Sequence, residues 1–209
     1  MSHWNRRRDR LLRIRGLAGF DVRHAFTLSG TYEMPFGRGR KFLSGASRMV
    51  QGALGGWSTN WILALYSGQP QSIGCPTGTG AGTGCYAFVV SPDLYIGRVD
   101  QFYNPAAFAN PPAVKTIGQT DYSPLGGYRT PVTGPPYRKL DFSTFKSFPF
   151  GDRYRFEFRA EAFNLTNSPA FANPGSLNFI NTLNFARITA TRNSPNDARQ
   201  IQMALKLYW

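Results

Sequence analysis

Five segments of the chain alternate between apolar and polar residues with a period of two. They cover residues 24–34, 56–66, 138–148, 152–164 and 199–209. This alternation is typical of a β-strand whose two faces meet different surroundings, because successive side chains point to opposite sides. In the fourth segment, Tyr154 and every second residue up to Ala162 are apolar, whereas the residues between them are Arg or Glu. A helix would scatter these charges around its circumference, so the sequence predicts an all-β fold.

The length of the five segments limits which kinds of β-sheet they can form. Each segment spans about 11 residues, which is longer than the usual five or six residues of a globular strand. It agrees with the 9–11 residues of a tilted strand that crosses a bilayer. The apolar row suits lipid and the charged row suits a water-filled lumen. The same alternation also fits a soluble β-sandwich, or an adhesin-like binding module, in which the apolar faces pack on each other.

The connections between the segments differ greatly in length. We predict a tight turn at residues 149–151, whereas residues 67–137 and 165–198 form long stretches rich in Pro, Gly, Asn and Thr. A compact soluble domain rarely carries two such loops, but a transmembrane β-barrel has short turns at one rim and long loops at the other. If the chain ends at the periplasmic rim, strand parity places both long loops outside the cell. We therefore expect a partial antiparallel transmembrane β-barrel, with about five long meander strands and long extracellular loops.

Composition and the first residues exclude several other classes. With 15% aromatic residues, 22 Gly and 15 Pro, the chain suits neither disorder throughout nor long helices. Residues 1–22 form a basic leader that lacks the apolar stretch of a signal peptide. We expect this leader to belong to an extracellular loop or to be disordered, and residues 23–209 to be the tail of a longer chain.

The charge balance raises the question of a nucleic-acid partner. Lys and Arg number 24 against 11 Asp and Glu, a formal net charge of +13, and such an excess attracts phosphate. A basic nucleic-acid-binding protein is thus an alternative, but no motif of that class is present and strands of membrane length stay unexplained. We expect no nucleic acid as partner. Part of the basic excess is instead predicted to face lipid and lipopolysaccharide phosphates in an outer membrane.

Catalytic and metal-binding patterns are not found in the sequence. The two histidines, His3 and His24, cannot be combined with other residues into a Ser/His/Asp set or an HExxH motif. Cys75 and Cys85 flank a Gly/Thr stretch, and both a disulfide loop and two unlinked thiols stay open. Two thiolates without a nearby His do not make a zinc site. We expect a non-enzymatic protein without cofactor or metal.

Three groups of residues are candidates for function. The last segment ends in an apolar row and a terminal aromatic residue, a pattern read by the barrel-assembly machinery of Gram-negative outer membranes: Met203, Leu205, Leu207 and Trp209. The charged row of the fourth segment is predicted to line the lumen, with a solvated, self-neutralising strand face as the alternative: Arg153, Arg155, Glu157, Arg159 and Glu161. Aromatic residues of the longer loop are predicted ligand contacts, because they offer contact area at low entropic cost: Tyr86, Phe102, Tyr103, Phe108, Tyr122 and Tyr128.

Several runs of residues resemble one known family. They include FDVRHAFTLSGTYEMPFGRGRKF at 20–42, GGWSTNWILALYSGQP at 55–70, RAEAFNLTNSPAF at 159–171 and RQIQMALKLYW at 199–209. These runs resemble the C-terminal barrel portion of TonB-dependent outer-membrane receptors, most closely the Oar-like group with an N-terminal carboxypeptidase-regulatory-like domain. The likeness covers roughly residues 20–209, and the run at 159–171 is its most specific part.

The resemblance implies a barrel of about 22 strands with a plug in its lumen. It also implies extracellular loops that capture an unidentified ligand, and TonB, which pulls on the plug. This chain contains about five of those strands and no plug segment. We therefore expect it to be a fragment that serves uptake within a longer receptor in the outer membrane and is not competent alone.

Overall fold

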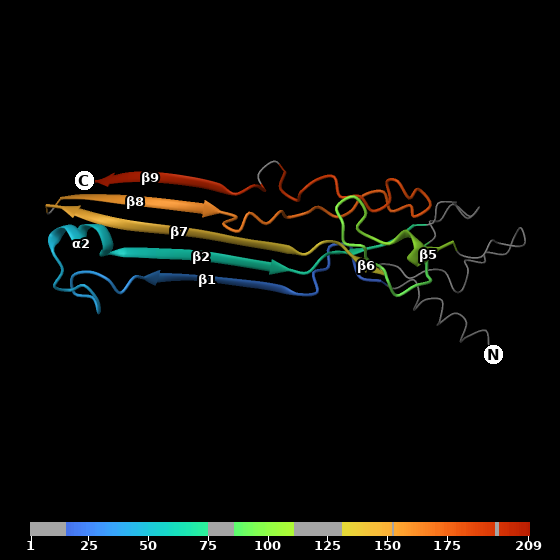
Figure 1. Cartoon of the computed structure of the whole chain (residues 1–209), viewed down its shortest axis with the longest axis horizontal. Coiled ribbons are helices and arrows are strands. Elements are labelled where there is room, and N and C mark those ends of the chain that lie inside the picture. Colours follow the sequence, from blue (N-terminus) through green and yellow to red (C-terminus); the bar gives the residue numbers. More distant parts are fainter. Residues whose placement is uncertain (1–15, 75–85, 111–130, 152, 195–196) are drawn as a thin grey trace, which may run out of the picture. The chain divides into compact units, whose positions relative to one another are not determined.

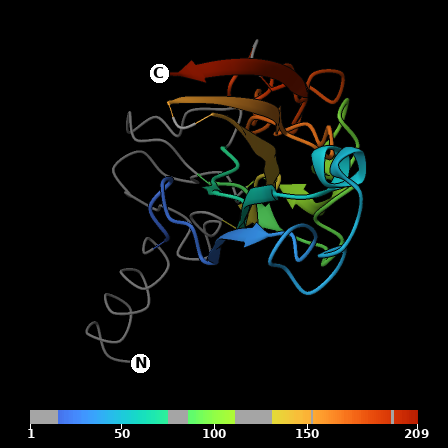
Figure 2. The same ribbon diagram turned by 90° about the vertical axis from the view of Figure 1, so that its left-hand side faces the viewer.

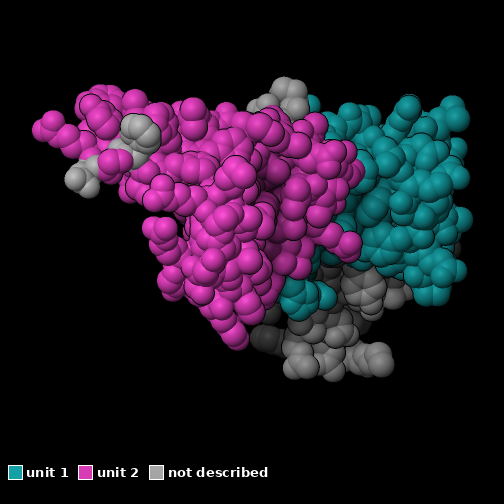
Figure 3. Space-filling view, turned by 60° about the vertical axis from the view of Figure 1, so that its left-hand side comes forward, with its two compact units in different colours: residues 1–24, 67–136, 171–194 teal, residues 25–66, 137–170, 195–209 magenta. Residues whose placement is uncertain are grey.

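The computed structural model describes residues 16–74, 86–110, 131–151, 153–194 and 197–209. The chain divides into two compact units, which Figure 3 shows in two colours. The sheet unit comprises residues 25–66, 137–170 and 195–209. The loop unit comprises residues 1–24, 67–136 and 171–194. Each unit is described by itself below.

The sheet unit is built on five long antiparallel strands in the order β1-β2-β7-β8-β9 (Figure 1). Their bounds are β1 Ala25–Glu33, β2 Trp57–Tyr66, β7 Tyr137–Phe150, β8 Tyr154–Phe163 and β9 Gln200–Tyr208. Each predicted segment coincides with one strand, although β7 extends beyond its segment at both ends. Each of the first four long strands pairs with the long strand that follows it in the chain, so the predicted all-β meander is confirmed. The described sheet is open, with β1 and β9 as its edges. No helix within the described ranges is long and apolar enough to cross a membrane.

The turn between β7 and β8 lies further along the chain than predicted. The strand β7 continues to Phe150, with Pro149 opposite Arg155, and the chain reverses between Phe150 and Tyr154, where Gly151 and Arg153 are turn residues. Beyond Lys146, β7 pairs with β8 alone, and a proline is tolerated where one side of a strand has no ladder partner. Gly151 then supplies the positive φ of +66° that the reversal needs.

The chain between β1 and β2, residues 34–56, forms a structured connection rather than an open loop. It contains the short helix α2, Arg48–Leu54. The rings of Phe36 and Phe42 lie 5.7 Å apart, so the first part of the connection folds back on itself. Gly37 has a φ of +121°, and a Cβ added there would lie 3.0 Å from the Cα of Gly55, so glycine allows the two ends to approach closely.

The sheet unit has two distinct ends. We call the turn end the one that carries the β1–β2 connection, the turn between β7 and β8 and the C-terminus; Figure 2 views the sheet from this end. The loop end is the opposite one, where β2 leads into residues 67–136 and β8 leads into residues 164–199. Both long connections therefore leave the sheet at the same end.

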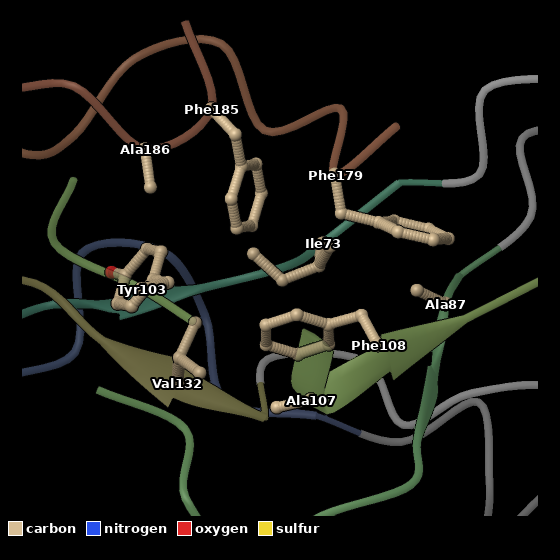
Figure 4. Close-up of a cluster of buried hydrophobic side chains, with 9 residues drawn as sticks. All are labelled: Ile73, Ala87, Tyr103, Ala107, Phe108, Val132, Phe179, Phe185 and Ala186. Atoms are coloured by element: carbon tan, nitrogen blue, oxygen red, sulfur yellow. The ribbon is translucent and has the colours of Figure 1, made fainter. Parts of the chain in front are cut away.

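The loop unit has a hydrophobic core of its own. Its short elements are β3 Pro70–Gln71, β4 Phe88–Val89, a 3₁₀ turn at Pro105–Ala107, β5 Phe108–Ala109 and β6 Val132–Thr133. The strand β3 pairs with β6, and β4 pairs with β5. Nine buried side chains from both long connections pack together (Figure 4): Ile73, Ala87, Tyr103, Ala107, Phe108, Val132, Phe179, Phe185 and Ala186. The long polar connections thus fold into one body instead of separate loops.

Candidate functional site

The strand register places the apolar rows of all five strands on one surface, here called the apolar face. Leu28 lies opposite Leu63, which in turn lies opposite Leu140. The even-numbered residues of β8 continue the same surface onto Ile201 to Leu207 of β9. Large side chains of the two edge strands are exposed on this face, 53% for Phe26 in β1 and 72% for Met203 in β9, whereas Leu63, Leu140 and Phe142 in the central strands are half-buried. A surface of this kind needs an apolar medium or partner.

Two basic residues mark the limits of the apolar face. Among the described strand residues on this face, Arg138 and Lys146 are the charged ones, near opposite ends of β7. They are eight residues apart in the sequence, or about 26 Å at roughly 3.3 Å per residue of strand. At the strand tilt of a membrane barrel, about 35–45°, this length spans about 18–21 Å of height, which is most of the apolar band of about 25 Å. The face therefore carries a band of membrane dimensions between two cations.

The opposite surface, here called the polar face, carries a charge network. Arg159 lies between Glu157 at 3.0 Å and Glu161 at 3.6 Å. The Gln202 side-chain amide in β9 donates to Glu161 Oε2 at 2.5 Å. The structure places Arg153 in the turn before β8, so the predicted charged row contains four strand residues instead of five. The cause is the displaced turn, which includes Gly151 and Arg153.

Other groups on the polar face also have partners. Lys139 Nζ lies 2.9 Å from Asp141 Oδ2, and the Arg155 guanidinium lies 4.5 Å from the centre of the Tyr208 ring. These contacts require no ligand, because each joins two groups on the same face. Ion pairs of this kind contribute little stability when exposed, about 0–1 kcal/mol each. The polar face is thus compatible with water, and its role as the wall of a lumen stays a prediction.

Asn164, in the most family-specific run of the sequence, fixes the point where the chain leaves β8. Its side-chain amide donates to the backbone carbonyls of Ser168 at 3.0 Å and Asp197 at 2.7 Å. Its Oδ1 accepts from Ser168 N at 3.1 Å, and its backbone N–H donates to Asp141 Oδ1 at 2.8 Å. The residue is buried with a φ of +52°, a conformation that Asn tolerates better than most residues. One residue thereby ties together the loop end of β7 through its backbone N–H, and the exit of β8 and the approach to β9 through its side chain.

The predicted ligand contacts fall into three groups. Tyr103 and Phe108 are buried in the core of the loop unit, so their side chains are not presented to a ligand and their selection as contacts is corrected. The Tyr103 hydroxyl donates to Gln71 Oε1 at 2.7 Å, and burial raises the pKa of Tyr103. Tyr86 and Phe102 are half-buried. Tyr122 and Tyr128, like Cys75 and Cys85, lie outside the described residues.

The loop unit exposes other apolar side chains that sequence analysis did not select. They are Val90, Tyr95, Ile96, Val99, Ile180 and Leu183. Tyr95 is 46% exposed, and its ring packs edge-on against Tyr103 at 5.7 Å between centroids. These residues offer contact area that the buried aromatics do not.

A pocket of about 390 Å³ lies at the turn end of the apolar face. Its lining residues come from the β1–β2 connection and from the face itself: Met34, Phe36, Leu43, Leu54, Trp57 and Thr144. Beside it, Lys146 is buried, donates to the Gly52 carbonyl and lies 5.5 Å above the Trp57 ring. This pocket was not predicted from the sequence. The available signal was a lysine at a position of β7 that belongs to the apolar row.

The C-terminal row lies on the edge strand. Met203, Leu205 and Leu207 project from the apolar face of β9 and are exposed, and Trp209 follows the strand and is 87% exposed. The row is therefore placed where another molecule can reach it. Its recognition by the assembly machinery stays a prediction.

Comparison with known proteins supports a membrane-barrel interpretation of the apolar and polar faces. A protein-family model described as an outer membrane beta barrel domain matches residues 3–202. No similar protein is found among curated sequences, and no solved structure matches. A soluble sandwich would cover the apolar face with a second sheet, whereas here large side chains of this face such as Phe26, Leu28 and Met203 are exposed. The chain thus belongs to the outer-membrane β-barrel domain family, and it is an outer-membrane protein.

Proposed function

We propose that the chain is the C-terminal sector of a TonB-dependent receptor barrel of the Oar-like group. The larger protein would take up a ligand with energy supplied through TonB, and this sector would not act as an enzyme. The open sheet supports the proposal, because unpaired strand edges at β1 and β9 are costly in lipid. Further strands therefore belong beside both edges, and a barrel that holds a plug needs many of them.

One observation carries the proposal furthest. Both long connections leave the sheet at the loop end and share one hydrophobic core. Membrane barrels place long loops on the extracellular side, and loops held by a rigid scaffold often bind ligands. We assign ligand capture to the exposed side chains of the loop unit, around Tyr95, Ile96 and Val99.

The remaining partners follow from the same proposal. TonB would act through the plug of the larger protein. The barrel-assembly machinery would read the row that ends in Trp209. Lipopolysaccharide would meet basic residues at the loop end, such as Arg138.

Depletion of compounds from the growth medium tests the proposal in the source bacterium. Three strains are compared by mass spectrometry of the spent medium: the wild type, a strain lacking the gene that contains this chain, and a strain lacking TonB. We expect both deletion strains to leave the same compound unconsumed. Unchanged depletion in the first deletion strain, or a compound that it leaves but the strain lacking TonB consumes, would contradict the proposal.

A further inference from the structure

We propose that the pocket at the turn end binds an anionic glycerophospholipid. One acyl chain would lie in the pocket, and the phosphate would lie on basic side chains of the β1–β2 connection. This inference rests on the orientation of the proposed function, in which the turn end meets the periplasmic leaflet.

The pocket itself suits hydrocarbon. Its volume of about 390 Å³ is within the range of ligand-binding pockets, about 300–1,000 Å³. The polar groups among the lining side chains already have partners: the Thr144 hydroxyl donates to the Ser58 carbonyl at 3.2 Å, and Trp57 Nε1 donates to the Ala53 carbonyl. Trp57 and Thr144 belong to the apolar face, so the pocket is continuous with the surface that meets lipid. An acyl chain can enter it from the membrane without crossing water.

The wall of the pocket is built by the connection and held in place. Leu43, which lines the pocket, has a φ of +62°, a backbone conformation that is unfavourable for a residue with a Cβ. The Gln51 side-chain amide donates to the Leu43 carbonyl, and Trp57 Nε1 donates to Ala53 O at 2.8 Å. Lys146 adds a third bond, to the Gly52 carbonyl. These bonds join α2, the preceding turn and the apolar face into one structure.

The connection carries a strong positive charge. Residues 34–56 contain Arg38, Arg40, Lys41 and Arg48 and no Asp or Glu. Arg40 pairs with Glu33 at 2.5 Å. The other three are exposed, and among the described residues they form no ion pair. The phosphate of an anionic lipid would accept charge-assisted hydrogen bonds from these side chains. A zwitterionic headgroup would bind them less strongly, because its own cation is repelled by the same basic residues.

The depth of the site fits the headgroup level of a membrane. Lys146 marks one limit of the apolar band, and its ammonium also lies 4.9 Å from the centre of the Phe148 ring. Trp57, Phe148 and Tyr154 lie near this limit, as in the aromatic girdles of membrane barrels. A lipid with its phosphate on the connection would therefore place its acyl chains along the apolar face. Phospholipid is chosen over lipid A, the acylated phosphate anchor of lipopolysaccharide, because the turn end is opposite the long connections.

Native mass spectrometry of the purified full chain in nonionic detergent tests the inference. Phosphatidylglycerol, phosphatidylcholine and lipid A are titrated separately. We expect one phosphatidylglycerol per chain, bound at least tenfold more tightly than phosphatidylcholine. Leu54→Trp fills the pocket and should weaken phosphatidylglycerol binding at least tenfold, whereas Leu54→Met, which preserves an apolar side chain of similar size, should bind within about twofold of the wild type.

A matched pair of triple variants separates headgroup recognition from overall charge. Arg38→Gln, Lys41→Gln and Arg48→Gln together should abolish the preference for phosphatidylglycerol. Arg23→Gln, Arg98→Gln and Lys206→Gln remove the same charge elsewhere and should leave the preference unchanged. Circular dichroism confirms that each variant keeps its β-structure before binding is measured.

Three results would overturn the inference. They are equal binding of phosphatidylglycerol and phosphatidylcholine, preferential binding of lipid A, and equal loss in the two triple variants. Each of these leaves the proposed uptake function standing, because that function is tested by depletion of compounds from the medium. Conversely, unchanged depletion in the strain lacking this gene, together with the expected preference for phosphatidylglycerol, would contradict the proposed uptake function and leave the lipid site standing.

Discussion

At the residue scale, two asparagines of the run at 159–171 make different numbers of side-chain hydrogen bonds. Asn164 is buried and makes three side-chain hydrogen bonds, whereas Asn167 is exposed and its Oδ1 accepts one, from Arg199 N at 3.1 Å. Both have a positive φ, 52° and 50°, so backbone strain is nearly matched between them. The pair therefore isolates the contribution of the buried bonds.

We predict that Asn164→Ala lowers the free energy of unfolding by about 3 kcal/mol. This figure assumes about 0.5–1.5 kcal/mol for each lost hydrogen bond. The matched variant Asn167→Ala should lose only about 1 kcal/mol on the same basis. Urea unfolding in detergent, followed by circular dichroism, measures both values. Equal losses would show that Asn164 does not hold the strand ends together.

The buried phenol of Tyr103 leads to a second prediction, on how the stability of the loop unit depends on pH. Burial raises the pKa of Tyr103 above the ordinary tyrosine value of 10.0. The folded loop unit therefore favours the neutral phenol, so the stability from this group is complete below pH 10 and falls as the pH rises above it. Between pH 8 and pH 11 the wild type should lose more thermal stability than Tyr103→Phe, measured as the shift in Tm by circular dichroism. The same shift in both proteins would contradict this account.

At the element scale, β7 anchors the β1–β2 connection through one side chain. Lys146 is 3% exposed and donates to the Gly52 carbonyl at the end of α2. Replacing Lys146 by Met preserves much of the side-chain length but removes the ammonium that donates to the Gly52 carbonyl. Hydrogen bonds to charged groups contribute about 1.5–3 kcal/mol.

We predict that Lys146→Met increases the rate of trypsin cleavage after Arg48 at least tenfold. The cause is local opening of the connection, which exposes α2 to the protease. Lys206→Met, on the polar face of β9, is the control and should leave that rate unchanged. Cleavage at the wild-type rate in Lys146→Met would show that other contacts hold α2 in place.

The five strands could be predicted from the sequence because side-chain alternation is a local property of each strand. The sequence shows the apolar row of each strand separately, but it does not show which residues of neighbouring strands lie opposite each other. The structure supplies this register, for example Leu28 opposite Leu63. The pocket could not be predicted, since it forms where residues 34–56 fold onto β2 and β7, a contact between distant parts of the chain. Tyr103 and Phe108 were misassigned because an aromatic residue in a long connection serves a core as readily as a ligand. The turn was predicted two residues too early because Pro149 was taken as a turn residue. Beyond Lys146, β7 pairs with β8 alone, and a strand tolerates proline where one of its sides is unpaired.

At the scale of the whole molecule, both the proposed uptake and the proposed lipid site depend on which end of the sheet faces out of the cell. The apolar face, the polar face and the family match place the sheet in the outer membrane. The loop end carries both long connections, and the turn end carries α2 and the lipid pocket. Uptake by the loop unit and phospholipid binding at α2 both require the loop end to be extracellular.

The most direct test is cysteine labelling on intact cells with a maleimide that cannot cross the membrane. Cys75 and Cys85 are first replaced by Ser, and single cysteines are then placed at Leu183 of the loop unit or Met49 of α2, which are 87% and 85% exposed. The account predicts that Leu183→Cys is labelled on intact cells, and that Met49→Cys is labelled only after the outer membrane is permeabilised. Labelling of Met49→Cys but not Leu183→Cys on intact cells would contradict it.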